Sequence, residues 1–402
     1  MEWLHDLIFT PSVASALFIL ALVIALGLTL SHIKIGTVSL GVTWILFVGI
    51  AAGQFGLSIP PDISHFVKEF GLILFIYSVG IEVGPTFFSS FRSGGITLNI
   101  LAATIVLLGS GLAVLFWHLT GDDPVAMTGV LYGAVTNTPG LGAAQQTYSE
   151  LHGSVTNPLF AQGYAVAYPL GVIGIILSIT VLRALFKVDL RREQEIYERN
   201  AHRNGIDLQR RIAEKRPAQR EQPNLFFIFI GIALGVLLGS TPIGVPGMTV
   251  PVKLGLAGGP LVVSILLAYF GPRIHIATYV SVSANMMIRQ IGISLFMAAV
   301  GLGAGQGFVQ TVLNGGYWWV LWGFVITIVP CLLVGAIARW GCKLSFFTIA
   351  GLISGATTDP PALAYSNSLC GGSQASVAYT TVYPLSMFLR VAVAQLLVIF
   401  AF

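Results

Sequence analysis

Charge is scarce in this sequence of 402 residues: Asp, Glu, Lys and Arg together make up 9% of it, whereas 55% of the residues are apolar. A soluble protein needs about a quarter of its residues charged to cover its surface. The composition therefore excludes a soluble globular protein and indicates that most of the surface faces lipid. Since a helix needs about 20 mostly apolar residues to cross a bilayer, the chain has room for about ten crossings.

Cysteine and histidine offer little chemistry. Cys331, Cys342 and Cys370 have neither the spacing of a metal site nor that of a disulfide framework. The seven histidines fall at the termini and in expected loops, so the sequence predicts no His–Glu metal cluster in the membrane. We therefore expect no metal, no cofactor and no enzymatic activity.

Positive charge is concentrated in one stretch. Of the 20 Lys and Arg residues, 11 lie between Arg183 and Glu221, together with seven acidic residues. Such a mixed composition is typical of a polar linker and gives no sign of nucleic-acid binding. It predicts a first membrane unit over 1–186, a linker over 187–223 and a second membrane unit over 224–402.

Apolar stretches of crossing length occur five times on each side of the linker. They run over 13–30, 36–53, 66–84, 96–118 and 158–182, then over 224–240, 254–270, 288–305, 317–338 and 376–401. Before the last stretch of each half lies a segment broken by Pro and Gly, 126–150 and 345–369. Irregular backbone at membrane depth survives only where protein or water satisfies its polar groups. We interpret both segments as re-entrant hairpins or broken helices in an all-α polytopic membrane protein.

The short loops sort by charge if Met1 lies outside the cell. Cytoplasmic loops carry an excess of Lys and Arg, and this topology gives the cytoplasm the linker and nearly all other loop cations. The cytoplasmic loop cations are then Lys34, Arg92, Arg273, Arg339 and Lys343, and the opposite side holds Asp62, Asp122, Asp123 and Lys253. We expect a bacterial inner-membrane protein with a cytoplasmic linker and both termini in the periplasm.

The two halves resemble each other in sequence. One constant offset relates Gly71, Gly80 and Gly84 to Gly292, Gly301 and Gly305, and it also relates Lys68 to Arg289. Further matches join Gly133–Leu141 to Gly355–Leu363 and Tyr164–Leu170 to Tyr379–Leu385. Because each half has an odd number of crossings, a duplication predicts two inverted repeats, an architecture found in many secondary transporters.

The centres of the two broken segments carry the strongest functional signal. Asp359 and Pro360 suit the N-cap and first turn of a helix, and Thr138 or Asn137 with Pro139 suits the same role in the first half. A helix N-terminus carries about half a positive charge, so two such ends inside the membrane predict a site for an anionic substrate. A kinked packing helix without a ligand is the alternative. The candidate residues are Thr136, Asn137, Thr138, Pro139, Thr357, Thr358, Asp359 and Pro360.

Two charged residues lie deep in the second half. Asp359 is its only carboxylate at membrane depth, where a charge costs at least about 2.5–3.5 kcal/mol. It can bind a cation, carry a proton, contact the substrate or only cap its helix. Arg390 has no counterpart in the first half, and its planar guanidinium matches a carboxylate. We predict that Arg390 binds substrate; a salt bridge to Asp359 or Glu82 is the alternative.

Other polar residues of the crossings support weaker predictions. Lys68 and Arg289 are expected to snorkel to the interface, Lys68 is not expected to pair with Glu69, and Glu82 has a structural or gating role. Tyrosines recur at a spacing of four residues in both halves, which places each pair on one helix face and predicts cavity lining or packing. These pairs are Tyr164 with Tyr168 and Tyr379 with Tyr383.

Several motifs resemble the aspartate–alanine exchanger family of bacterial secondary transporters, and most closely its branch of uncharacterised transporters. They are Leu74–Pro85, Thr136–Gly142, Thr357–Ala364, Ser283–Asn285 followed by Arg289, and Tyr383–Arg390. The resemblance covers both membrane halves. It implies a fold related to cation–proton antiporters with crossed broken helices, exchange of small carboxylates or amino acids, and substrate-site roles for the hairpin residues, Asn285 and Arg390.

One departure from the family concerns the linker. Members of the family commonly carry two cytosolic TrkA-C-like regulatory domains between the halves, whereas only polar residues of 187–223 stand there in this chain. We expect a homodimer that transports a small anionic or amino-acid substrate as a secondary active transporter or antiporter, by alternating access. The two hairpins and their Tyr-Pro-Leu helices are expected to move as a unit against a scaffold. An ion- or proton-coupled symporter and a channel remain the alternatives.

Overall fold

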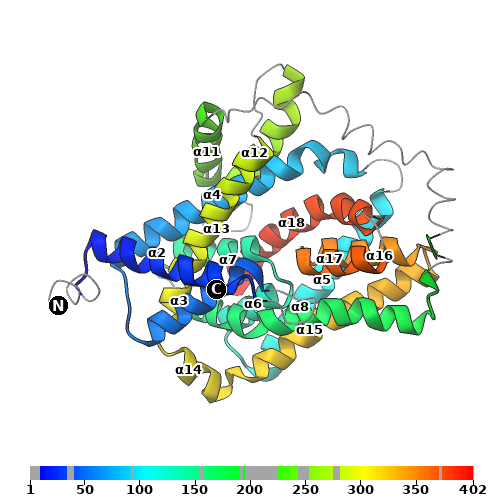
Figure 1. Cartoon of the computed structure of the whole chain (residues 1–402), viewed down its shortest axis with the longest axis horizontal. Helices are drawn as coiled ribbons and strands as arrows, with labels where there is room; N and C mark the ends of the chain where they lie inside the picture. Colours follow the sequence, from blue (N-terminus) through cyan, green and yellow to red (C-terminus); the bar gives the residue numbers. More distant parts are fainter. Residues whose placement is uncertain are drawn as a thin grey trace.

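A computed structural model describes residues 10–33, 40–91, 95–153, 157–190, 193–194, 225–242, 253–274, 281–370 and 374–401. Within these ranges all regular structure is helical (Figure 1). The helices of the first half are α2 (Val13–Leu30), α3 (Trp44–Gln54), α4 (Pro61–Phe87), α5 (Gly95–Thr120), α6 (Pro124–Ala134), α7 (Thr138–Leu151) and α8 (Leu159–Leu185). Those of the second half are α11 (Leu225–Ser240), α12 (Gly255–Phe270), α13 (Val282–Gly305), α14 (Phe308–Thr311), α15 (Trp318–Trp340), α16 (Phe346–Ala356), α17 (Pro360–Cys370) and α18 (Gln374–Ala401).

Eight of the described helical segments are long and apolar enough to cross a membrane, which confirms a polytopic membrane protein. The other two expected crossings correspond to shorter apolar helices, Gly41–Gln54 and Leu225–Ser240. The predicted linker lies largely outside the described residues. In its described part, Glu193 forms an ion pair with Arg339 at the end of α15.

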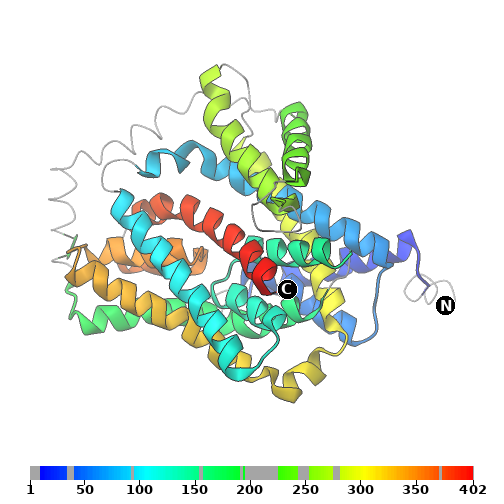
Figure 2. The ribbon, with the colours of Figure 1, turned by 180° about the vertical axis from the view of Figure 1, so that it is seen from behind.

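The helices pack in two groups (Figures 1 and 2). In the first, here called the scaffold group, α3 packs on α13, α12 packs on α4, and α4 packs on α13, with α2 and α11 at the outside. In the second, here called the hairpin group, α6 packs on α8, and α16 packs on α18. The same group includes α7, which packs on α18, α17, which packs on α16, and α5 and α15, which pack against the others. The groups meet mainly where α7 and α18 reach α4 and α12.

Glycines allow α4 and α13 to touch backbone to backbone. A Cβ on Gly71 or on Gly292 would lie 2.7 Å from the carbonyl oxygen of the other glycine. Gly71 also faces Phe296, and Gly292 faces Phe75, so the two helices run antiparallel. Equivalent glycines of the two halves therefore meet at one crossing point.

Each broken segment folds as a helical hairpin. Gly129 packs on Phe160 and Gly133 packs on Tyr164, so α6 and α8 run parallel. The chain must therefore turn back through α7 before it enters α8. The second half repeats this arrangement, because Gly351 packs on Ala375 and Gly355 packs on Tyr379. Helical hairpins thus stand where the family resemblance implied crossed broken helices.

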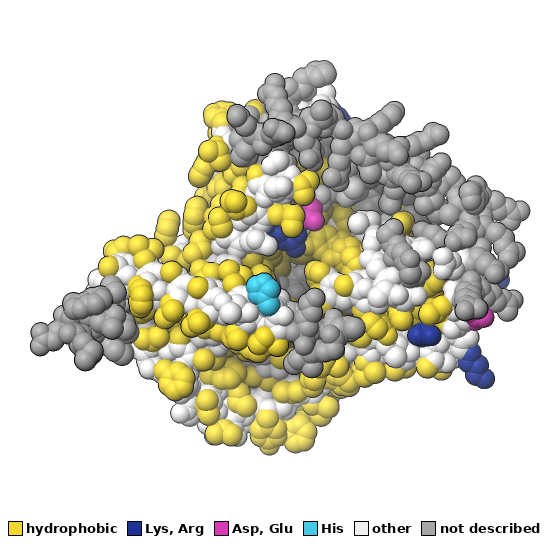
Figure 3. Space-filling view, in the orientation of Figure 1, with side chains coloured by type: hydrophobic (Ala, Val, Ile, Leu, Met, Phe, Trp, Pro, Cys, Tyr) yellow, Lys and Arg dark blue, Asp and Glu magenta, His cyan; other side chains and the backbone are white. Residues whose placement is uncertain are grey.

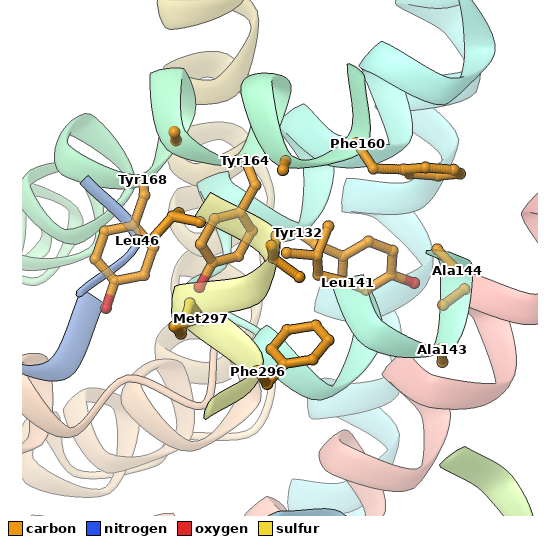
Figure 4. Packing of buried hydrophobic residues seen from close by; sticks show 14 of the residues in the cluster. Leu46, Tyr132, Leu141, Ala143, Ala144, Phe160, Tyr164, Tyr168, Phe296 and Met297 are labelled. Carbon is orange, nitrogen blue, oxygen red and sulfur yellow. The ribbon is translucent and has the colours of Figure 1, made fainter. Parts of the chain in front are cut away.

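The hairpin group contacts the scaffold group through a buried apolar cluster. Figure 4 shows Leu46 of α3 with Phe296 and Met297 of α13 beside the rings of Tyr164 and Tyr132. All five side chains are buried. This packing holds the first hairpin against the scaffold group.

Candidate functional site

The tips of the two hairpins touch each other. Thr136 Oγ1 donates a hydrogen bond to the carbonyl oxygen of Thr357 at 3.3 Å. Asn137 Nδ2 donates to Thr358 Oγ1 at 2.9 Å, and all four residues are buried. Two segments more than two hundred positions apart in the sequence thus meet inside the molecule.

The same local geometry builds both tips. Asn137 caps α7, because its Oδ1 accepts a hydrogen bond from the Gly140 amide at 2.7 Å. Asp359 caps α17 in the same way, with its Oδ2 at 3.2 Å from the Ala362 amide nitrogen. The predicted N-cap role of Asp359 is confirmed, and in the first hairpin the cap is Asn137 rather than Thr138.

Both tips hold a threonine in a left-handed backbone conformation. Thr136 has φ of 54° and Thr358 has φ of 57°, a region that β-branched residues rarely occupy. Such conformations cost about 1–3 kcal/mol each and cluster at functional sites. The two prolines follow in the first turn of the next helix: Pro139 is the second residue of α7 and Pro360 the first of α17.

The two tips differ in charge. The Asn137 side chain is fully engaged, since Nδ2 also approaches Met387 Sδ at 3.5 Å. Asp359 is completely buried, and its Oδ1 has no hydrogen-bond partner among the described residues. Within the described chain, no Lys or Arg forms an ion pair with Asp359. A neutral cap in one half is thus matched by a buried carboxylate in the other.

Arg390 holds the end of α16. Its Nε and Nη2 donate hydrogen bonds to the Ala356 carbonyl oxygen at 3.0 and 2.6 Å, and the Tyr132 hydroxyl donates to the Arg390 carbonyl at 2.8 Å. Arg390 is buried, and in the described structure it bridges neither to Asp359 nor to Glu82. The predicted alternative of a salt bridge is therefore not what the structure contains. No described residue accepts a hydrogen bond from its Nη1.

The tyrosine pairs lie beside the tips. The Tyr164 hydroxyl is 3.0 Å from Thr138 Oγ1, and the rings of Tyr164 and Tyr168 are 5.3 Å apart. Tyr379 and Tyr383 stack at 5.2 Å. Tyr164, Tyr168 and Tyr379 lie close enough to Asp359 to interact with it electrostatically. Tyrosines from both halves thus interact with the one carboxylate, and Tyr164 also reaches the tip of the first hairpin.

Two predictions about Lys68 of α4 need correction. Lys68 and Glu69 do pair, with Nζ and Oε1 3.4 Å apart, and both are buried, so Lys68 does not snorkel. Adjacent residues on a helix point apart at Cβ, but the long lysine side chain curls back. Arg289 binds Glu82 at 2.7 Å across the α4–α13 contact, and its side chain is 32% exposed.

Asn285 lies apart from the hairpin tips. Its Nδ2 donates to the Ser78 carbonyl at 3.0 Å, and its Oδ1 accepts from Ser78 Oγ at 2.9 Å. These bonds tie α13 to α4 and leave the Asn285 amide fully used. Within the described structure no hydrogen bond joins it to the tips, so its predicted place in the site depends on the family resemblance alone.

The sequence did not identify the residues that bind the C-terminal ends of α6 and α16. Thr327 Oγ1 donates to the Ala134 carbonyl at 2.7 Å, which is the counterpart of the Arg390 bond to Ala356. Tyr132 reaches Arg390 from α6. The repeat offset identifies Ala134 and Ala356 as equivalent, but a partner on another helix leaves no mark in a single sequence.

The equivalent positions of the two halves differ in exposure. The Lys68 side chain is 8% exposed, whereas that of its counterpart Arg289 is 32% exposed. The first turns of α7 are buried, but Pro360 and Ala364 of α17 are exposed. Figure 3 shows a hollow near the centre of one face, with basic and acidic atoms at its rim.

Among the described residues no group of three His, Cys, Asp or Glu side chains could hold a metal ion.

Comparisons with known proteins agree with a transporter. The family model of the Asp-Al_Ex type, described as a predicted permease membrane region, matches residues 19–184 and 227–399. Uncharacterized transporters of Bacteroides fragilis and Bacteroides thetaiotaomicron are 39% and 37% identical, over 96% and 99% of this chain and 96% and 100% of their own. One of Porphyromonas gingivalis is 32% identical over 99% of this chain and 98% of its own. No solved structure matches.

The relatives are longer than this chain. The alignment with the Bacteroides fragilis relative extends over 542 positions, whereas this chain has 402 residues. The relative therefore contains insertions that this chain lacks. Residues 185–226, between the two segments that match the family model, include the predicted linker.

Proposed function

The chain belongs to the aspartate–alanine exchanger family, by its predicted permease membrane region, and on that premise we propose that it exchanges small carboxylates or amino acids across the bacterial inner membrane. The observation that carries the proposal is the contact between the hairpin tips. It brings the N-termini of α7 and α17 together inside the molecule, where their partial positive charges favour an anionic group.

Each candidate residue has a role in this proposal. The partial positive charges at the starts of α7 and α17 attract the carboxylate, with Thr136, Thr138, Thr357 and Thr358 supplying hydroxyl and backbone groups. Arg390 fixes the end of α16 through Ala356 and offers its remaining Nη1 donors to the substrate. The four tyrosines, Tyr164, Tyr168, Tyr379 and Tyr383, line the space beside the tips, and Asn285 braces α13 from a distance.

Inverted repeats would give the alternating access that exchange requires. Equivalent helices α4 and α13 run antiparallel and touch at equivalent glycines. The packing of α3 on α13 mirrors that of α12 on α4, and α6 on α8 mirrors α16 on α18. Matches to one family model in both halves add support. With the topology expected from loop charges, the first hairpin enters from the periplasm and the second from the cytoplasm.

We infer that the hairpin group moves against the scaffold group. The first hairpin is closed, since α7 packs on α12 and α4, whereas one face of α17, with Pro360, Ala364 and Ser368, is exposed. The state described here would then open toward the cytoplasm. In the opposite state the roles would exchange, with α17 sealed against α3 and α13. The scaffold group is the part that we expect to form a homodimer.

Counterflow in proteoliposomes tests the exchange. Vesicles loaded with one unlabelled amino or dicarboxylic acid should take up a labelled one, and uptake should stall without internal substrate. Rapid flux without internal substrate, accompanied by a current that follows the voltage, would identify a channel. A panel of amino acids, dicarboxylates and their deaminated analogues would name the substrate class.

A cross-link between the two groups tests the motion. Gln146 on α7 accepts a hydrogen bond from the Ala257 amide on α12 at 2.8 Å, so Gln146→Cys with Ala257→Cys, joined by a short reagent in a cysteine-free background, should stop counterflow until it is reduced. The control joins Asn367 to Ser376, which are hydrogen-bonded within the hairpin group at 2.9 Å. That cross-link should leave counterflow intact. Full exchange with the first pair locked would contradict the motion.

A further inference from the structure

Asp359 is more than a helix cap. Capping uses only its Oδ2, which accepts from the Ala362 amide, and Oδ1 has no hydrogen-bond partner among the described residues although the residue is fully buried. Asn137 occupies the equivalent position of the first hairpin and caps α7 with a neutral amide. Since Asn and Asp cap helices about equally well, the charge of Asp359 is not needed for the fold of its hairpin.

No cationic side chain faces this carboxylate in the described structure. α17 packs on α8, α16 and α18, and the titratable groups of these helices that interact electrostatically with Asp359 are tyrosines, namely Tyr164, Tyr168 and Tyr379. Arg390 is directed at the Ala356 carbonyl. Arg289 on α13 is engaged by Glu82. Among the described residues, the charge of Asp359 therefore has no counter-charge.

A buried carboxylate without a partner is costly, because desolvation disfavours its charged form. A compact cation removes that cost, and two oxygens of the second tip, Asp359 Oδ1 and the hydroxyl of the adjacent Thr358, are suited to one. The first tip contacts the same Thr358 hydroxyl through Asn137. The unpartnered oxygen thus lies where the substrate is proposed to bind.

We propose that Asp359 is a coupling-cation site, occupied by a proton or by Na⁺. The inference deepens the proposed function and rests on it. The cation is taken up from one side of the membrane and released on the other as the hairpin group moves, so it adds a positive charge to the loaded site. Exchange would then depend on a cation, and a cation gradient could drive the accumulation of one substrate in exchange for another.

Thermal unfolding of the purified protein without substrate tests cation binding directly. Replacing choline by Na⁺, or lowering the pH from 8 to 6, should raise the Tm of the wild type by at least about 2 °C. A response to Na⁺ identifies sodium and a response to acid alone identifies the proton. Asp359→Asn keeps the cap and removes the charge, so it should fold and lose the response. Glu82→Gln, which removes a carboxylate elsewhere, should keep it.

Transport supplies the second readout. With unlabelled substrate inside, a Na⁺ or pH gradient should raise the accumulation of labelled substrate by wild-type proteoliposomes, and Asp359→Asn should lose this effect of the gradient. Should Asp359→Asn not fold, Asp359→Glu keeps the charge with a displaced oxygen, and the midpoint of its cation response should shift by about tenfold. Wild-type protein that responds to neither cation, or an Asp359→Asn variant that responds like wild type, overturns the inference.

Two further outcomes separate this inference from the proposed function. If Asp359→Asn loses binding of amino acids but not of their deaminated analogues, and no inorganic cation acts on the wild type, the partner of Asp359 is the substrate ammonium and the coupling site is refuted. If the cation response is present but no carboxylate or amino acid is exchanged, the coupling site stands and the proposed substrate class fails.

Discussion

Removing the guanidinium of Arg390 should damage the second hairpin and the substrate site together. Arg390 donates two hydrogen bonds to the buried carbonyl of Ala356, and a charged hydrogen bond contributes about 1.5–3 kcal/mol. The two bonds share one acceptor, so Arg390→Ala should cost about 3 kcal/mol, including the carbonyl left without a partner. Arg390→Lys retains the charge and one donor but loses the planar fork, so it should weaken substrate binding about tenfold, or about 1.4 kcal/mol.

The assay combines thermal unfolding, substrate-induced thermal shift and counterflow for each variant. Tyr132→Phe is the matched control, because it removes the hydrogen bond to the Arg390 carbonyl and leaves the guanidinium in place. It should cost about 1 kcal/mol of stability and keep substrate binding. A loss of binding as large as that of Arg390→Ala would show that hairpin position, rather than the guanidinium, controls the site.

The double variant Arg390→Ala with Asp359→Asn distinguishes the observed geometry from a salt bridge. If Arg390 and Asp359 were partners, removing both would restore much of the stability lost with one. Because Arg390 instead bonds the Ala356 carbonyl, we expect the two losses to add within about 0.5 kcal/mol. Wild-type binding and transport of a carboxylate by Arg390→Ala would refute the role of Arg390 in an anionic site.

Further predictions concern the scaffold group. Gly292→Ala places a Cβ 2.6 Å from the backbone of α4 and should lower the Tm and the folded yield. Gly303→Ala, whose Cβ would have nothing within 4 Å, should leave both unchanged. Size-exclusion chromatography after heating measures the folded yield, and equal stability of the two variants would contradict the close crossing. Glu69→Gln breaks a buried pair with Lys68 and should cost about 3 kcal/mol, more than Glu82→Gln at its half-exposed pair; the reverse order would contradict the assigned burial.

The sequence predicted the helices well because apolar length and proline position act locally. The residue types of Asp359 and Pro360 predicted a helix start, and α17 begins there. The choice between a broken helix and a hairpin depended on whether α6 and α8 run parallel, which only the contacts of Gly129 and Gly133 reveal. Length alone could not decide it, since both alternatives use the same residues.

Charged residues were harder to interpret. Lys68 and Arg289 occupy equivalent positions, and the sequence suggested one role for both. Their partners differ because Glu82 has no acidic counterpart in the second half, whereas Lys68 has Glu69 beside it. Arg390 was recognised as unusual from its depth, but its acceptor is a backbone carbonyl, and a carbonyl is present at every position. Residue type alone cannot point to such a partner.

The departures from equivalence between the halves have a common direction. Asn137 corresponds to Asp359, and Ile175 corresponds to Arg390 through the offset that joins the tyrosine pairs. Both charges therefore belong to the second half and to the hairpin group. If the hairpin group moves as proposed, exposure changes from one side to the other while these charges stay with the substrate site. The field that an anionic substrate meets would then be nearly the same from both sides, which suits an exchanger because each substrate must bind in either state.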